Sequence, residues 1–146
     1  MRLVLDTNVV VSALLGPSAP ARLLELAAEG EIDLFSSAEL LAELAEVLGR
    51  ADISRRLGVQ RRAAPELLAF YEALVERVVA ASIARTAADP DDDDVLAAAA
   101  DVIVSGDKRL RNLKSFHRIP ILDPAEALKR IPQRRTEPGS SEPAKP

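Results

Sequence analysis

The sequence predicts a single α/β domain in which a parallel sheet is flanked by helices. Short apolar segments alternate with amphipathic ones, which is typical of βαβ units. Apolar residues make up 48% of the 146 residues and aromatic residues only 3%, so we expect an aliphatic core of the kind that helices form on a parallel sheet. A chain of this length can bury the core of one domain.

The N-terminal elements are expected to be a strand and two helices. Residues 3–5 are a short apolar strand, and the apolar residues 9–15 continue as a helix after a turn. Residues 21–29 contain good helix formers, and Gly30 stands where a helix C-terminus favours glycine.

A second strand and a well-marked helix follow. Residues 32–35 form a buried strand, and Ser36 with Glu39 has the spacing of a capping box at a helix N-terminus. Apolar residues at helical spacing then continue to Leu48, which predicts a helix over this segment.

The second half of the chain repeats the alternation. Pro120 suggests that the last strand lies at an edge of the sheet, because proline lacks a backbone N–H. The expected elements are a short helix at 53–57, a helix at 65–79, strands at 102–105 and 119–122, and a helix from Pro124 to about Ile131.

We expect one domain over residues 1–131 and a disordered tail over 132–146, which is rich in proline and lacks apolar residues to anchor it. No apolar stretch is long enough to span a membrane, and the N-terminus lacks a signal-peptide pattern. Together with the absence of cysteine, this predicts a cytoplasmic protein with no membrane partner.

Two aspartates stand directly after predicted strands. Asp6 ends the first strand, and Asp107 follows strand 102–105 after a single glycine, so both should lie at the same end of the sheet. Either one alone is explained by helix capping, since aspartate is a favoured N-cap. Together they indicate a site that a cation could compensate.

Further acids point to the same chemistry. Glu43 lies at the border of the buried stripe of its helix, and Asp89 to Asp94 holds five carboxylates in six residues. The simpler explanations are that Glu43 is a solvated surface residue and that the acids of 89–94 stabilise the N-terminus of a helix. Carboxylates from separate elements are the ligands of Mg²⁺, whereas zero cysteines and one histidine exclude a thiolate or multi-histidine zinc site.

The order of these motifs resembles that of PIN domains, over residues 1 to about 131. The closest resemblance is to the VapC-like branch of toxin components from toxin–antitoxin pairs. The segments that carry it are Asp6-Thr7-Asn8, Ser36 to Leu44, Asp89 to Asp93, and Val104-Ser105-Gly106-Asp107-Lys108.

The resemblance implies a Rossmann-like PIN domain that is an Mg²⁺- or Mn²⁺-dependent endoribonuclease acting on RNA. It also implies inhibition by a cognate antitoxin protein, and a homodimer. Carried over residue by residue, it assigns catalysis and metal binding to Asp6, Glu43, Asp93 and Asp107, and supporting hydrogen bonds to Asn8 and Ser105. Thr7 is a weaker candidate.

The chain departs from this pattern between Asp93 and Asp107, where it is about four residues shorter, roughly one helical turn. The third acid could therefore be Asp91 or Asp92, and a catalytically weak or silent PIN fold that binds protein or RNA is the alternative function. Phosphoryl-transfer and receiver domains fit less well, because neither gives Glu43 a role.

The net charge of −4 is unusual for a protein that binds nucleic acid. Two basic clusters could follow an RNA backbone, although basic residues on helices are more often a solvated surface. They are Lys108, Arg109, Arg111, Lys114 and Arg118, and Arg50, Arg55, Arg56, Arg61 and Arg62.

Overall fold

Strand β1 lies inside the sheet around which the chain folds, between β2 and β4. The structure is a computed structural model, and it describes residues 1–78, 100–108, 112, 115–116 and 119–132. The strand order within the described residues is β3-β2-β1-β4-β6-β5. All neighbouring strands pair in parallel except β5, which is antiparallel to β6. The strands are β1 (Arg2–Leu5), β2 (Asp33–Ser36), β3 (Val75–Arg77), β4 (Val102–Val104), β5 (Ser115–Phe116) and β6 (Ile119–Leu122).

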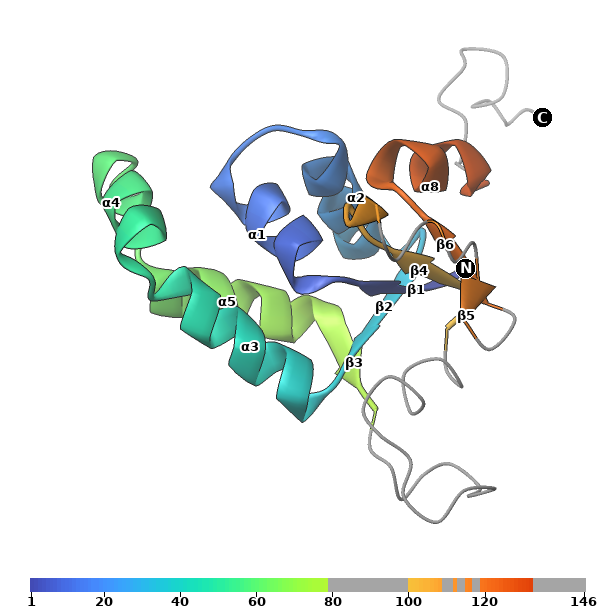
Figure 1. Ribbon diagram of the computed structural model, residues 1–146, viewed down its shortest axis with the longest axis horizontal. Helices are drawn as coiled ribbons and strands as arrows, with labels where there is room; N and C mark the ends of the chain where they lie inside the picture. The colour runs from blue at the N-terminus through green and yellow to red at the C-terminus, as the bar shows by residue number, and fades with distance from the viewer. Residues whose placement is uncertain (79–99, 109–111, 113–114, 117–118, 133–146) are drawn as a thin grey trace, which may run out of the picture.

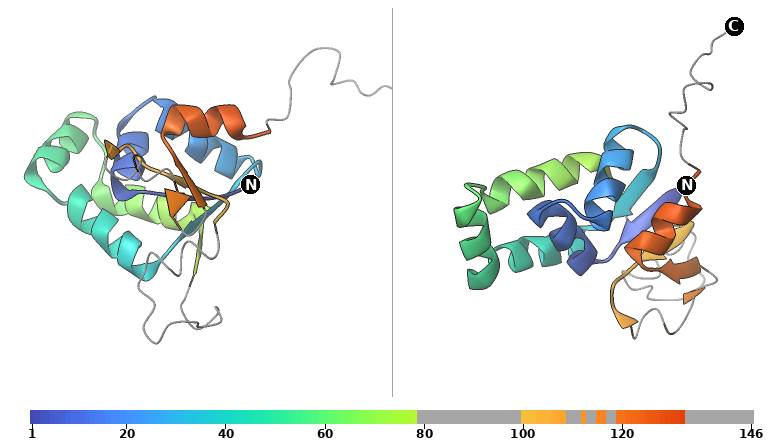
Figure 2. Two further views of the ribbon diagram at one scale, coloured as in Figure 1. Left: turned by 45° about the vertical axis from the view of Figure 1, so that its right-hand side comes forward. Right: turned by 90° about the horizontal axis from the view of Figure 1, so that it is seen from above.

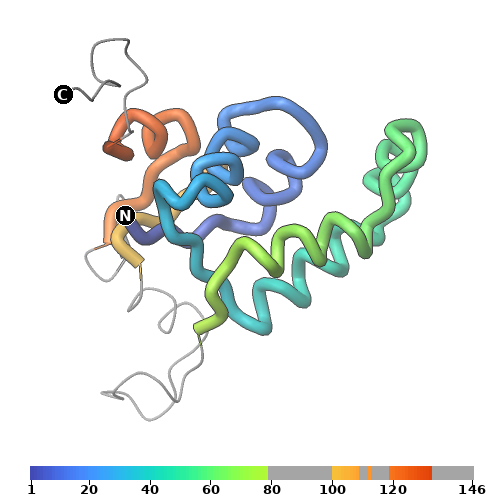
Figure 3. The backbone as a smooth tube through the Cα atoms, turned by 180° about the vertical axis from the view of Figure 1, so that it is seen from behind, coloured from blue at the N-terminus to red at the C-terminus, as the bar shows by residue number. Residues whose placement is uncertain are grey.

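Helices pack against this sheet. Helix α2 lies beside α8 and helix α3 beside α5, with α1 between α2 and α3 (Figures 1 and 2). All five contribute side chains to the core cluster that contains Leu3 and Leu5 of β1. Helix α4 lies at the end of α3 and α5 that is farthest from the strands (Figure 3). The helices are α1 (Thr7–Leu15), α2 (Ala19–Ala28), α3 (Ala38–Leu48), α4 (Ala51–Val59), α5 (Ala64–Leu74) and α8 (Pro124–Arg130). The expected α/β class, a parallel sheet flanked by helices, is confirmed.

The core is aliphatic, as the composition predicts. Leu3 and Leu5 of β1 are buried in a large cluster with side chains of α1, α2 and α3, whereas Val4 packs on the other face beside Phe35 and Leu40. A central strand buried on both faces is the arrangement that a parallel sheet requires.

Helix α1 is held in place at its C-terminal end by side chains from the segment that joins α4 to α5. Arg62 Nη1 donates to the backbone oxygen of Leu14 at 2.8 Å, and Gln60 Nε2 donates to that of Leu15 at 3.0 Å. These bonds satisfy carbonyls that the helix itself leaves without partners. Gly30, just beyond α2, has a φ of 80°, a left-handed conformation that favours glycine at a helix end.

The capping residue of α3 differs from the expected one. Ser37 is the N-cap, and its Oγ accepts from the Leu40 N–H at 3.1 Å. Ser36 is instead the last residue of β2, where its backbone oxygen accepts from Val78 N–H. The helix therefore begins one residue later than the capping-box pattern indicates, because strand pairing holds Ser36 in extended backbone.

The helix expected over residues 65–79 is wrong in its last turn. Helix α5 ends at Leu74, and Val75–Arg77 form β3, which pairs with β2. The free edge of β2 offers backbone partners to this segment, and such tertiary pairing overrides a helical pattern.

The expectation that residues 119–122 form an edge strand is also wrong. Strand β6 pairs with β4 on one side and with the short β5 on the other. Pro120 is opposite Ser115 of β5, while the residues aligned with β4 are Ile121 and Leu122, so proline does not interrupt the pairing with β4.

No single helix among the described residues is long and apolar enough to cross a membrane. Helices α1 and α2 meet the length and composition test only as a pair bent by 88°. The tail expected over 132–146 lies outside the described residues, except for Pro132.

An ion pair joins the amino end of β1 to the amino end of β4. The backbone N–H and the guanidinium of Arg2 donate to the Asp101 carboxylate at 2.9 and 3.2 Å, and these hydrogen bonds lower the pKa of Asp101. A lowered carboxyl pKa stabilises the fold above the ordinary aspartate pKa, and this contribution disappears as the pH falls through the lowered value. Both side chains are half exposed, so the effect is small.

Tyr71 of α5 provides the first testable prediction. Its side chain is only 2% exposed, burial raises its pKa, and among the described residues its hydroxyl is the one buried side-chain polar atom without a hydrogen-bond partner. Tyr71→Phe should therefore leave the free energy of unfolding unchanged or raise it by about 1 kcal/mol, since it removes an unsatisfied group. Urea denaturation measures the change. A loss of stability would mean that the hydroxyl has a partner in solution.

Candidate active site

Asp6 joins the end of β1 to the start of α1. Its backbone N–H donates to the Val104 oxygen of β4 at 2.9 Å, which places it at the carboxyl end of two adjacent parallel strands. Its Oδ1 accepts from the Thr7 N–H at 2.9 Å, so the residue is also the N-cap of α1. Capping therefore uses only one of the two carboxylate oxygens.

Ser105 connects the end of β4 to this carboxylate. Its side chain is fully buried, and its Oγ donates to Asp6 Oδ2 at 3.1 Å. The same Oγ accepts from the Asp107 N–H at 3.0 Å, while the Ser105 N–H donates to the Leu122 oxygen of β6. The hydroxyl thus fixes Asp6 and the backbone of Asp107 at once.

Thr7 connects Asp6 to α3. Its side chain is buried, and its Oγ1 donates to Glu43 Oε1 at 2.8 Å. Glu43 is exposed and follows the buried Leu41 on α3, so its carboxylate reaches the sheet edge from the border of the helix. Thr7 therefore orients a glutamate that lies 36 residues away in the sequence.

The result is one chain of hydrogen bonds from Asp107 through Ser105, Asp6 and Thr7 to Glu43. Two buried hydroxyl groups donate to the carboxylates of Asp6 and Glu43, and the Ser105 hydroxyl also accepts from the backbone N–H of Asp107. Hydroxyl donors of this kind fix the orientation of carboxylates.

The remaining candidates lie differently. Asn8 is exposed and forms no side-chain hydrogen bond with a described residue, so in the described part of the chain it does not support these acids. Asp93 lies outside the described residues, as do Asp91 and Asp92 and the shortened segment as far as Ala99.

A pocket of about 430 Å³ opens beside the acids. Asp107 and Gly106 line one side of it and Asn8 and Ser12 of α1 another. The Asp107 carboxyl thus borders a space that can admit part of a substrate.

The donor set fits a hard divalent cation in its chemistry, because every candidate ligand is a carboxylate oxygen. Among the described residues, however, no three acidic or histidine side chains are grouped closely enough to hold an ion by themselves. Mg²⁺ commonly keeps several waters and binds through one or two carboxylates, so one or two of the Asp6, Glu43 and Asp107 carboxylates would be enough to hold it.

Comparison with known proteins identifies the family of this site. The PIN domain family matches residues 2–109, which is most of the chain. The chain belongs to the PIN domain family. The match begins at β1 and ends just beyond Asp107, so this PIN domain includes all four acids of the sequence-based candidate set. No curated protein matches the chain.

PIN domains are generally nucleases that bind RNA and typically use divalent metals. Sequence analysis ranked Thr7 below Asn8, whereas in the structure Thr7 contacts both Asp6 and Glu43. The sequence signal for Thr7 was its position: it directly follows the aspartate at the end of the first strand and begins a mostly apolar helix. Arg56 borders a second pocket, on α1. No signal in the sequence singled it out, because it is one of ten basic residues in the two clusters named above.

Proposed function

We propose that this PIN domain is a metal-dependent endoribonuclease that hydrolyses phosphodiester bonds in RNA. The observation that carries the proposal is the hydrogen-bond chain that links Asp6, Glu43 and Asp107 at the carboxyl end of the sheet. Ligand sites of open α/β sheets occupy this edge, and its acids match the cation chemistry that phosphodiester hydrolysis needs.

In the proposed mechanism, Mg²⁺ or Mn²⁺ would be held by Asp6, Glu43, Asp107 and an acid of the Asp89–Asp94 run, which is Asp93 by the family resemblance. When bound, such an ion activates water and neutralises charge on the phosphate. Ser105 keeps its Oγ–H directed at Asp6, and Thr7 does the same for Glu43, so both carboxylates stay oriented. Water adds across the P–O bond, and the leaving oxygen takes a proton.

Cleavage of RNA in the presence of metal tests this function. The purified chain is incubated with a mixed single-stranded RNA in Mg²⁺ or Mn²⁺, and in parallel with a chelator. We expect fragments only when metal is present, with activity restored when the ion is added back in excess. Cleavage that survives chelation would point to a contaminant or to metal-independent chemistry.

A second candidate function is a PIN fold that binds RNA or protein without cleaving it. The spacing between Asp93 and Asp107, about four residues shorter than in the pattern that the chain resembles, supports it. A protein that binds RNA in chelator, gains no thermal stability from Mg²⁺ and leaves the RNA intact would establish it.

The finer assignments rest on the resemblance stated above. We propose a VapC-like toxin over residues 1–131, checked by a cognate antitoxin, acting in the cytoplasm and forming a homodimer, with residues 132–146 as a disordered tail. Growth arrest when the wild-type chain is expressed, but not when an inactive variant is expressed instead, tests the toxin role. Light scattering of the purified protein tests the dimer.

A further inference from the structure

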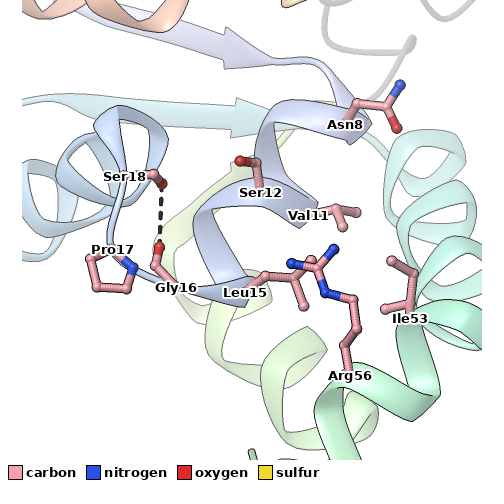
Figure 4. A pocket seen from close by; sticks show the side chains of 9 residues that line it. All are labelled: Asn8, Val11, Ser12, Leu15, Gly16, Pro17, Ser18, Ile53 and Arg56. Carbon is pink, nitrogen blue, oxygen red and sulfur yellow. Dashed lines mark hydrogen bonds between the residues drawn. The ribbon is translucent and has the colours of Figure 1, made fainter.

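A second pocket, of about 360 Å³, lies on the side of α1 toward α4. Its walls combine Val11, Leu15 and Ile53 with polar groups from Asn8, Ser12 and Arg56. Figure 4 shows Arg56 extending from α4 toward α1, with its guanidinium near Leu15 and below Ser12. The pocket therefore places one cation against an apolar wall beside two hydrogen-bonding side chains.

The guanidinium of Arg56 is available for a ligand. Among the residues that the structure describes, no carboxylate forms an ion pair with it. Helix α1 does not need it as a cap either, because Arg62 and Gln60 already donate to the carbonyls of Leu14 and Leu15. A guanidinium beside an apolar wall suits a planar or tetrahedral oxyanion, because its fork of N–H donors matches such oxygens.

The pocket is continuous with the acidic site along one face of α1. Asn8 and Ser12, one helical turn apart on α1 (Figure 4), line this pocket and also line the pocket that Asp107 borders. Ser12 lies six residues beyond Asp6, which is roughly 9 Å along the helix axis. A ligand that touches both ends must therefore be longer than a single small anion, as a polynucleotide strand is.

We propose that Arg56, with Ser12 and Asn8, binds a backbone phosphate of single-stranded RNA at a distance from the bond that is cut. The proposal rests on the proposed nuclease function and adds a substrate-positioning site to it. The phosphate oxygens accept from the guanidinium, and the Ser12 hydroxyl and Asn8 amide add neutral donors. The strand then follows α1 from the Arg56 pocket to Asp107.

The experiment compares the wild-type chain with Arg56→Gln and with Arg55→Gln as a matched control. Arg55 is the preceding residue of α4 and is exposed like Arg56, but it lines neither pocket. The two substitutions change the net charge equally. A fluorescent single-stranded RNA is titrated in chelator, over a range of salt concentrations, and anisotropy reports affinity. Cleavage kinetics in Mg²⁺ and circular dichroism are measured on the same preparations.

We expect Arg56→Gln to weaken RNA binding about tenfold, as the loss of one charge-assisted hydrogen bond would. The slope of log affinity against log salt should become shallower by about 0.7, the value for one phosphate contact on a single strand. KM should rise with kcat unchanged. Arg55→Gln should alter affinity by no more than about twofold, because a charge that lines neither pocket and faces solvent is screened.

Equal effects of the two variants, or no binding by the wild-type chain, would overturn the phosphate site. The two proposals fail separately. If the wild-type chain cleaves RNA and Arg56→Gln retains its affinity and salt slope, the nuclease function stands and the Arg56 site is wrong. If binding depends on Arg56 but no metal restores cleavage, the site stands and the nuclease function is wrong.

Discussion

Asp6→Asn is expected to abolish RNA cleavage while leaving the fold intact. The substitution keeps an oxygen that can accept from the Thr7 N–H, and asparagine is as good an N-cap as aspartate, so stability should change by less than about 1 kcal/mol. The negative charge at the carboxyl end of β1 is lost. We expect kcat to fall by on the order of 100-fold or more, the size typical of removing one preorganised electrostatic group.

The matched control for Asp6→Asn is Asp33→Asn. Asp33 is exposed at the start of β2, at the amino end of the sheet, and should retain full activity. Cleavage rates and urea denaturation are measured on both variants. An Asp6→Asn protein that is strongly destabilised, or one that cleaves at the wild-type rate, would show that this carboxylate serves the fold alone.

Thr7→Val is expected to have the second-largest effect. Valine has nearly the shape of threonine, so the buried position stays filled, but Glu43 loses the hydroxyl that donates to its Oε1. Loss of a group that orients a metal ligand typically lowers metal affinity or activity by about 10- to 100-fold. The loss of one hydrogen bond should lower stability by only about 1 kcal/mol.

Thr7→Ser separates this positioning role from simple packing. Serine keeps the hydroxyl but loses the methyl group, so it should recover most of the metal affinity while it lowers stability. The apparent Kd for Mn²⁺, measured by titration, is the deciding readout. A serine variant as impaired as the valine variant would mean that packing of the Thr7 methyl group, and not the bond to Glu43, maintains the site.

Local patterns were sufficient for most of the elements because they depend on neighbouring residues. The apolar period and helix formers of α3 and the glycine after α2 predict these helices without knowledge of the rest of the chain. The boundary errors arise where a distant partner intervenes. Ser36 stays in β2 and Val75–Arg77 leave the helix because both segments pair with other strands.

The candidate site divides in the same way. That Asp6 and Asp107 lie at one end of the sheet follows from sequence, since each comes after a strand and parallel strands share a carboxyl edge. Sequence also proposed Glu43, at the border of a helix. The contact that places it depends on the packing of α3 beside α1, which no spacing along the chain encodes.

The sequence by itself therefore determined the α/β class, the family and the acids at the strand ends, because strand and helix periodicity and strand-end positions are local properties. Only the tertiary structure decided that Thr7 joins Asp6 to Glu43, and that Arg56, unlike the adjacent Arg55, borders a pocket on α1. The physical reason is that a side chain's partners are set by how helices pack on the sheet, and residues with the same local pattern meet different neighbours.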